Sequence, residues 1–234
     1  MSKYSIETPL RSCFLSKDTV AQLEKYVFKT AAAINQLSLD EVREDFQIEA
    51  IDSLGTETFR SIHDYDRRQF SNDTRRLVLT YRRYHDKLTT LRIGFGLSEL
   101  WSTIELTLDG PNNARETAMG IVHDVRKLLK GHATLNFIFY GRYIVLPFIA
   151  FGVSIGVLPI LFDSKASPAL KALNMGIALG IVAFWLLFAT IRKINPYVLF
   201  DTPKNERIQQ SFGWVLKALF GIVVLGGSTR FILS

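Results

Sequence analysis

Residues 143–162 read YIVLPFIAFGVSIGVLPILF, and residues 172–191 read ALNMGIALGIVAFWLLFATI. Neither stretch contains a charged side chain, and nine residues separate them. About 20 apolar residues, each rising about 1.5 Å in a helix, cover the roughly 30 Å hydrocarbon core of a bilayer. The two stretches therefore predict a hairpin of two membrane-spanning helices, around which the rest of the chain is interpreted.

Charge divides the chain near residue 134. Residues 1–134 contain 19 Lys and Arg and 19 Asp and Glu, whereas residues 135–234 contain 9 and 3. The net charge of +6 therefore comes entirely from the second part. A nucleic-acid-binding domain would concentrate basic residues in its soluble part, so we expect no nucleic-acid partner. We expect a soluble domain at 1–134 and a transmembrane region at 135–234.

Basic residues near the ends of the spans predict the orientation. Four precede the first span and four follow the second, whereas the connecting loop 163–171 has two. The flanking residues are Arg126, Lys127, Lys130 and Arg142, and then Arg192, Lys193, Lys204 and Arg207. No apolar core of signal-peptide length lies at the N-terminus. We therefore expect a multi-pass protein of the plasma (inner) membrane, with its N-terminal domain in the cytoplasm.

A third apolar segment lies at 212–233 and is interrupted by Lys217 and Arg230. Both charges lie near its ends, from which long side chains reach the headgroups. We expect a third transmembrane helix here, and the alternative is a helix that lies in the membrane interface.

Glycine pairs at a spacing of four occur in both spans of the hairpin. They are Gly152 and Gly156, and Gly176 and Gly180. Small residues at this spacing let two helices approach closely. We expect these glycines to pack helices within the hairpin or between subunits of a homo-oligomer; the alternative is that glycine is simply common in membrane helices.

The first 134 residues combine helical and strand-like patterns. Apolar residues recur at steps of three and four in 17–35 and 113–130, which predicts two amphipathic helices. Apolar and polar residues alternate in several segments between them, as in strands with one buried and one wet face. These segments are 46–52, 75–83, 91–95 and 104–108, with a weaker candidate at 57–62. We predict a two-layer α+β domain: an antiparallel sheet of four or five strands with both helices on one face.

Arginine is concentrated in three doublets within residues 67–83. Alternation places Arg76 and Arg82 on the wet face of the sheet, and Arg92 joins them from the next strand. The planar guanidinium suits phosphate and carboxylate, so these arginines are our candidate site for an anionic small molecule, such as a nucleotide messenger, or for a protein partner. The alternative is a solvated face where arginines pair with Glu49 and Glu105 across strands.

Residues that carry familiar catalytic chemistry are sparse. Cys13 is the only cysteine, and the four histidines have no metal-ligand spacing. No phosphate-binding loop, nucleophile elbow or paired-carboxylate motif occurs. The two hairpin spans lack the ionisable residue that a proton-coupled transporter needs. We expect no metal site, no cofactor and no enzymatic activity.

These patterns together predict a non-enzymatic membrane protein. Its cytosolic domain would sense a ligand or bind a partner, and would control or anchor a small oligomeric bundle in the lipid bilayer. A membrane-permeabilising effector of a bacterial stress or antiviral system has this layout. Two alternatives stay open: a membrane-anchored scaffold or accessory subunit that docks a protein, and a membrane-associated enzyme that acts on a lipid-type substrate near Arg142 and residues 192–193.

Overall fold

The structure is a computed structural model. It describes residues 3–84, 86–109, 113–134, 136–137, 140 and 196–206. The predicted spans at 143–162, 172–191 and 212–233 lie outside these residues, as do Gly152, Gly156, Gly176 and Gly180. Within the part of the chain that is described, no helix is long and apolar enough to cross a membrane.

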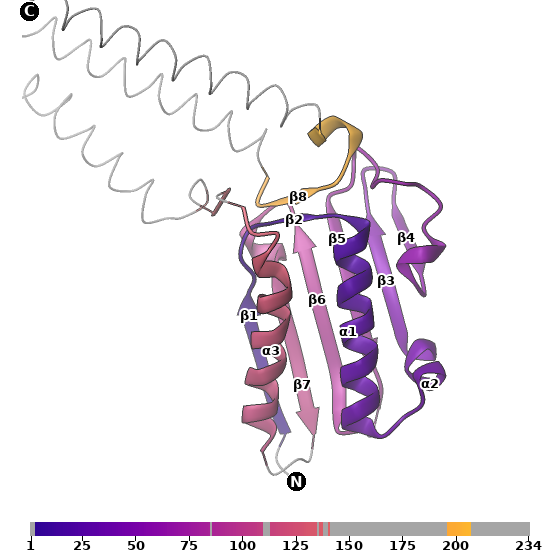
Figure 1. The fold of residues 1–234 in the computed structure, drawn as a ribbon, viewed down its shortest axis with the longest axis vertical. Coiled ribbons are helices and arrows are strands. Elements are labelled where there is room, and N and C mark those ends of the chain that lie inside the picture. The colour runs from indigo at the N-terminus through magenta and orange to yellow at the C-terminus, as the bar shows by residue number, and fades with distance from the viewer. Residues whose placement is uncertain are drawn as a thin grey trace, which may run out of the picture.

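A six-stranded antiparallel sheet forms the centre of the N-terminal region, which confirms the mixed α+β class (Figure 1). In spatial order its strands are β1 (Lys3–Pro9), β7 (Thr103–Asp109), β6 (Leu88–Gly96), β5 (Arg76–Arg82), β3 (Phe46–Ile51) and β4 (Thr56–Phe59). The sheet exceeds the predicted four or five strands because β1 joins its edge. Tyr4 and Ile6 are only half-buried, and their partners Leu108 and Leu106 lie far away in the sequence. Neither a strong alternation nor a hairpin turn therefore marks this strand.

Two long helices, α1 (Lys17–Asn35) and α3 (Ala114–Lys130), cover one face of the sheet (Figure 1). The hydroxyl of Ser16 caps the first turn of α1, where it accepts a hydrogen bond from the backbone N–H of Thr19 at 3.2 Å. Gln36 ends α1 in the left-handed conformation, with φ 59°, and donates its N–H to the carbonyl of Ala32. The observed bounds agree with the predicted helices at 17–35 and 113–130 to within one residue.

Three short helical turns are not indicated by the sequence pattern. They are α2 (Leu39–Glu44), η1 (Ile62–Asp64) and η2 (Glu99–Trp101). Each is too short for a helical period to be seen, and a helix of this length depends on its caps and its packing. In α2 the cap is local, because Ser38 and Glu41 form a reciprocal capping box.

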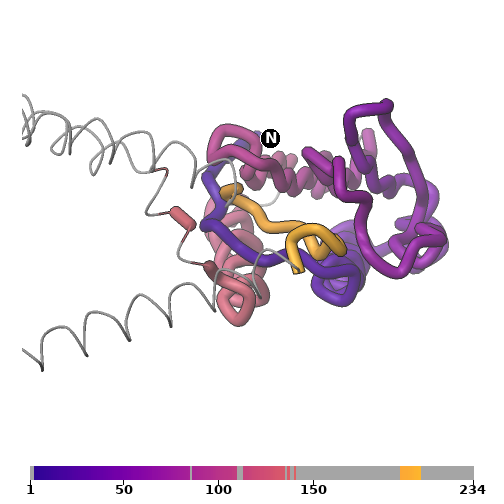
Figure 2. Tube along the Cα trace, turned by 90° about the horizontal axis from the view of Figure 1, so that it is seen from above, coloured from indigo at the N-terminus to yellow at the C-terminus, as the bar shows by residue number. Residues whose placement is uncertain are grey.

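A second, two-stranded sheet pairs a strand from the early part of the sequence with a strand from near residue 200. Its strands are β2 (Cys13–Leu15) and β8 (Val198–Phe200), and they run parallel. Figure 2 shows residues 196–206 lying against the early part of the chain at one end of the domain. These residues belong to the range 135–234 that we expect to be the transmembrane region. The folded N-terminal domain therefore includes a segment from beyond residue 134.

The same hydrophobic core contains side chains from both parts of the sequence. Val198 and Phe200 are buried in one cluster with Leu15, Leu23 and Ile93. Burying a side chain of this size contributes about 1.5–3 kcal/mol. The segment 196–206 is therefore an integral part of the packed domain, and its removal would open the core at that end.

Candidate functional site

The three predicted arginines lie on the sheet face opposite the helices, and Arg76 lies apart from the other two. Strand pairing places Arg92 opposite Thr80, so Arg82 is its diagonal neighbour, whereas Arg76 lies opposite Gly96 near the other end of β5. Arg92 Nη1 lies 3.2 Å from the Glu105 carboxylate. The Arg82 guanidinium lies over the Tyr84 ring, 5.0 Å from its centroid. Arg92 and Arg82 are thus already engaged by neighbouring side chains, as the solvated-face interpretation expects.

Arg76 lies beside a part of this face that a turn covers. Trp101 in η2 packs so closely on Gly96 that a Cβ there would lie 2.5 Å from the Trp101 Cβ. Val78, which alternation places on the wet face, is buried as well. A terminal nitrogen of Arg76 lies 3.8 Å from where a Cβ on Gly94 would stand. Glycine at these two positions therefore serves the close approach of Trp101, and Arg76 lies apart from Arg82 and Arg92.

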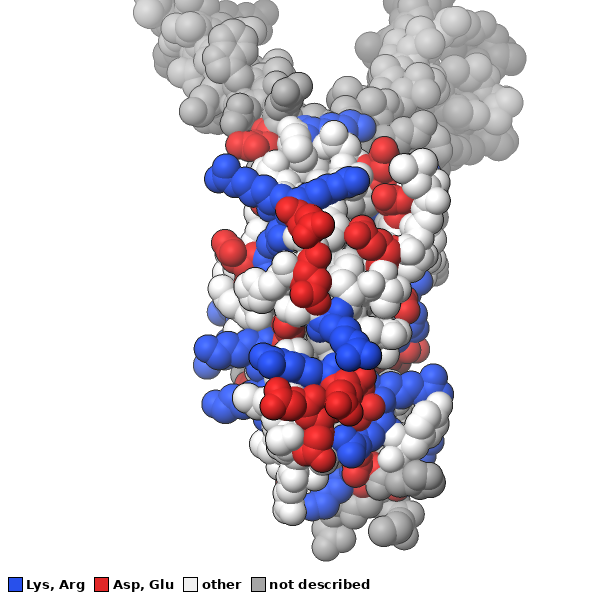
Figure 3. Space-filling model, turned by 90° about the vertical axis from the view of Figure 1, so that its right-hand side faces the viewer, with Lys and Arg blue, Asp and Glu red and all other residues white. Residues whose placement is uncertain are grey.

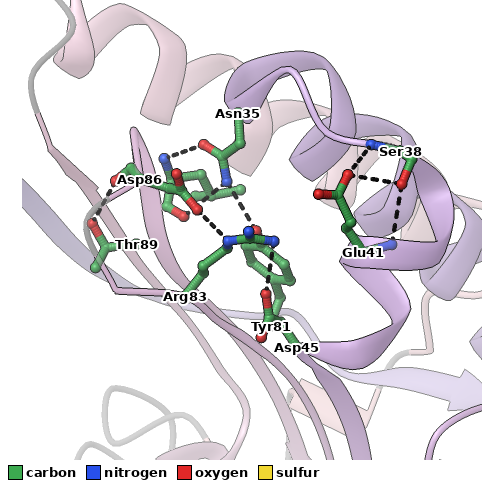
Figure 4. Close-up of polar contacts among 9 residues, drawn as sticks. Asn35, Ser38, Glu41, Asp45, Tyr81, Arg83, Asp86 and Thr89 are labelled. Carbon is green, nitrogen blue, oxygen red and sulfur yellow. Dashed lines mark hydrogen bonds and ion pairs between the residues drawn. The ribbon is translucent and has the colours of Figure 1, made fainter.

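Arg83, the partner of Arg82 in its doublet, belongs to a polar network at one end of the sheet (Figure 4). It pairs with Asp86 and with Asp45, whose carboxylate lies 3.1 Å from Nη1. Beside it, the Asn35 amide donates to the Tyr81 hydroxyl at 2.9 Å, and Asn35 Oδ1 accepts from the backbone N–H of Leu88 at 2.7 Å (Figure 4). These contacts hold the end of α1 against the β5–β6 hairpin. Their role is structural.

The strongest candidate site is a cavity of about 720 Å³ at the opposite end of the domain. It lies between the β1–β2 connection, the second half of α3, and the segment 196–206. We call it the basic cavity. Its lining residues are Pro9, Leu10, Arg11, Ser12, Cys13, Glu99, His123, Arg126, Lys127, Leu129, Lys130, Ala133 and Tyr197. Four Lys and Arg side chains thus face a single carboxylate.

Helical geometry brings the basic residues of α3 together. His123, Arg126, Lys127 and Lys130 are spaced i, i+3, i+4 and i+7, so they lie on one face of the helix. That face adjoins the buried stripe, which includes Val125. Arg126 has a structural role, because it donates to Thr8 Oγ1 at 2.6 Å and to the Pro9 carbonyl at 3.2 Å. The other three side chains are exposed along the rim of the cavity.

Neutral groups form the inner wall of the basic cavity. The Tyr197 hydroxyl donates to the Leu10 carbonyl at 2.7 Å. Burial, together with the negative charge of Glu99, raises the pKa of Tyr197 to about 12. Burial likewise raises the pKa of the Cys13 thiol to about 12. Both groups therefore stay protonated at neutral pH and add no negative charge to that of Glu99.

A second cavity, of about 1020 Å³, lies between α1, α2 and η1. Its lining carries four basic and four acidic side chains: Lys25, Lys29, Arg43 and Arg60 against Glu24, Asp40, Glu44 and Asp64. Figure 3 shows the molecule from the side of β4 and α2, where both signs of charge are interspersed. The carboxylate of the buried Glu24 already has partners, because it accepts hydrogen bonds from Ser61 Oγ at 2.8 Å and from the Ile62 N–H at 2.9 Å. This balance gives the second cavity no preference for a charged ligand.

The sequence pattern contained part of the signal for the basic cavity. As part of the sequence, Arg126, Lys127 and Lys130 indicate the orientation of the predicted spans, and their helical spacing also places them on one face of α3. Arg11 and Tyr197 could not be added from the sequence. They come from chain segments that only the folded structure brings to α3.

Comparisons with protein families, with curated proteins and with solved structures find no match to this chain. Within the described residues, no three His, Cys, Asp or Glu side chains are grouped so that they could hold a metal ion. The functional interpretation therefore depends on the geometry of the domain and on the pattern of the whole sequence.

Proposed function

We propose that this chain is an integral membrane protein whose cytosolic N-terminal domain controls a small oligomeric membrane region. The observation that carries the proposal is the docking of residues 196–206 into the core of that domain. This segment lies in the sequence between the predicted spans 172–191 and 212–233. The domain thus binds the segment that connects the second and third predicted spans. Its sequence also continues, past residue 134, to the first predicted span.

Short linkers on both sides of the docked segment couple it mechanically to the predicted spans. Each residue extends at most about 3.5 Å, so the five steps from Ile191 to Pro196 reach no more than about 18 Å. The six steps from Glu206 to Phe212 reach about 21 Å. Movement of the docked segment is therefore passed on to the ends of both spans. A domain that is merely anchored needs only one such connection, so the double connection favours control over passive attachment.

The contacts of the segment suit a two-state element. The Asp201 N–H donates to the Leu15 carbonyl, and the Phe70 N–H donates to the Asp201 carbonyl, both at 2.9 Å. β8 itself is only three residues long. Its few backbone hydrogen bonds and the burial of Val198 and Phe200 together contribute several kcal/mol. The differential affinity of a ligand can shift a population by this order of free energy. Binding of an anionic ligand or a protein partner would thus favour either the docked or the released segment.

The membrane region would respond by changing its assembly. Two or three short spans are too few to enclose a pore as a monomer, whereas several copies packed through Gly152, Gly156, Gly176 and Gly180 can. A domain that governs this packing would govern permeability. The proposed role is accordingly that of a non-enzymatic sensor and effector in the inner membrane, of the kind that permeabilises it in a stress or antiviral response.

The test compares a locked with a loosened segment in the full chain. Cys13 and Val198 are paired in register, and neighbouring strands place such residues about 5 Å apart, within the span of a disulfide. Oxidised Val198→Cys locks the docked state, and Phe200→Ala loosens it. We expect the two proteins to differ in subunit number, measured by native mass spectrometry, and in dye release from liposomes.

Val198→Ala, which cannot cross-link, is the matched control. After reduction of its disulfide, Val198→Cys should behave like Val198→Ala. The full chain should also stay in membranes washed with alkaline carbonate. Equal subunit number and equal dye release in the locked and loosened proteins would leave the membrane region a passive anchor. If carbonate extracts the full chain from membranes, the chain is not an integral membrane protein, and the proposed function fails.

A further inference from the structure

We propose that the basic cavity binds a phosphate-bearing anion, and that the phosphate is supplied by the headgroup of an anionic lipid. The choice of lipid over a free phosphate rests on the proposed membrane location. The anion site itself rests on the described residues alone.

Uncompensated charge is the first argument. Arg11, Lys127 and Lys130 line the cavity opposite Glu99. Among the described residues, no carboxylate lies within ion-pair distance of Lys127 or Lys130. By contrast, Arg92 on the sheet has Glu105 as its partner. Lysine ammonium groups that converge on a concave surface attract a compact anion, and phosphate accepts hydrogen bonds from several of them at once.

A simpler explanation accounts for only part of this arrangement. Basic side chains at the end of a helix favour the helix dipole, and they also orient a neighbouring span. Neither effect requires a cavity, and neither concerns Arg11, which lies on the β1–β2 connection. The joint presence of a hollow and of cations from two separate elements is what a ligand site needs.

The dimensions and position of the cavity favour a lipid headgroup. Its volume of about 720 Å³ lies within the range typical of small-molecule sites and exceeds the needs of a single phosphate ion. Tyr197 in its wall is six residues from the predicted span 172–191, a reach of at most about 21 Å. Ala133 is ten residues from the span 143–162, a reach of at most about 35 Å. Headgroups at the cytoplasmic surface thus come within range of the rim.

Occupancy of this cavity would be linked to the docked segment. Tyr197 forms part of the wall and is also tied to Leu10 through its hydroxyl. Release of residues 196–206 would remove this part of the wall, so the anion binds the docked state more tightly than the released state. By linkage, the anion stabilises docking by the same factor.

The test removes the two unpaired lysines and keeps everything else. The full chain with Lys127→Gln and Lys130→Gln is compared with a matched variant, Lys87→Gln and Arg115→Gln, which loses the same charge far from the cavity. The first probe is phosphatidylglycerol, with phosphatidylcholine as reference, counted as bound lipid by native mass spectrometry. The second probe is soluble glycerol phosphate. Arg126 is left intact because it holds Thr8 and Pro9.

We expect the cavity variant to bind phosphatidylglycerol about tenfold or more weakly, as the loss of two charge-assisted contacts implies. The matched variant should stay within about twofold of the wild type. Lys127→Arg with Lys130→Arg should restore binding, and melting curves check that α3 is intact. In wild-type protein, anionic lipid should also slow the labelling of Cys13, which lies beside β8.

The outcomes separate the parts of the proposal. Binding of glycerol phosphate but not of phosphatidylglycerol, lost in the cavity variant, would keep the anion site and overturn its lipid source. Equal binding of both probes by the cavity and matched variants, or no binding by the wild type, would overturn the site. The carbonate and disulfide tests of the proposed function do not involve Lys127 or Lys130, so their failure is distinguishable from failure here.

Discussion

The two ends of the N-terminal domain are closed in different ways. Where α1 ends, the contacts of Asn35, and that of Arg83 with Asp45, span 38 to 53 residues of sequence, and the network is complete within residues 35–89 (Figure 4). At the other end, β2 finds its partner in β8, and Tyr197 contacts Leu10 across 187 residues of sequence. One end therefore depends on contacts within the first 89 residues, whereas the other depends on the part of the chain that carries the predicted spans.

The two ends should therefore respond differently to mutation. A perturbation at the α1 end should weaken the domain as a whole and leave the docking of residues 196–206 unchanged. A perturbation at the β8 end should release that segment first. Cys13, the only cysteine, is 1% exposed and pairs with Val198, so its alkylation rate reports release directly.

The largest effect is expected for Phe200→Ala. Phe200 is 1% exposed and contacts Phe70 edge-to-face at 5.8 Å between ring centroids. Truncating a buried Phe costs about 3–5 kcal/mol, which is a large share of what the docked segment contributes. Cys13 alkylation should become at least about 100-fold faster. Leu54→Ala, at a side chain that is 93% exposed, is the control, and a labelling rate equal to that control would contradict the docked geometry.

Asn35→Ala should have the next largest effect, at the opposite end. It removes the bonds to Tyr81 and to both backbone groups of Leu88, which lie in partly buried surroundings. Unpaired buried polar groups cost about 1–3 kcal/mol each, so the free energy of unfolding should fall by about 2–3 kcal/mol in urea titrations. Asn35→Asp keeps the acceptor for the Leu88 N–H and should lose less.

The alkylation rate of Cys13 under native conditions gives the contrast between the ends. In Asn35→Ala it should stay near the wild-type value, because the β2–β8 pair is untouched. A rise as large as that of Phe200→Ala would show that the two ends open together, and the distinction between them would fail.

Alkaline pH should weaken the β8 end before the other. Cys13 has a pKa of about 12 in the fold against an ordinary value of 9.0, and Tyr197 about 12 against 10.0. A raised folded pKa means that stability is complete below the ordinary value and is lost as pH rises toward the folded value. The contribution of these two groups to stability should thus be constant below about pH 9, and should then fall by up to about 1.4 kcal/mol per pH unit for each group above its ordinary pKa.

One variant can show which end of the domain loses stability at the lower pH. Burial also raises the pKa of Tyr81 at the α1 end, and its contribution starts only above its ordinary value of 10.0. Urea midpoints of Cys13→Ala should therefore lose the decline that begins near pH 9 and keep the part above pH 10. An unchanged profile would mean that the thiol is not protected by β8.

The smallest effect is expected on the open sheet face. Arg92 and Glu105 are 36% and 38% exposed, and such a pair contributes about 0–1 kcal/mol. A double-mutant cycle of Arg92→Gln and Glu105→Gln should give a coupling energy in this range, falling with added salt. Arg76→Ala together with Arg82→Ala should leave folding intact, and loss of a ligand response in that variant would return the sheet arginines to the candidate site.

Local patterns predicted the parts of the fold that local contacts create. The apolar period of α1 and α3, and the alternation in β5, β6 and β7, each require only neighbouring residues, and the structure has all of them. β1 and β8 could not be predicted, because each pairs with a strand far away in the sequence. The same reason explains the site: the arginines of the sheet are close in sequence yet mostly engaged, whereas the basic cavity needs Arg11 and Tyr197 from distant segments.

The 187 residues between Leu10 and Tyr197 also have a consequence for biosynthesis. A ribosome that adds 5–20 residues per second needs roughly 10 to 40 s to cover that distance. During this interval β2 has no partner strand, and the end of the core around Leu15 stays open to water or to a chaperone. The N-terminal domain can be completed only after the predicted hairpin has been synthesised, so a chain that stalls before residue 206 keeps an exposed apolar edge by which the cell can recognise and degrade it.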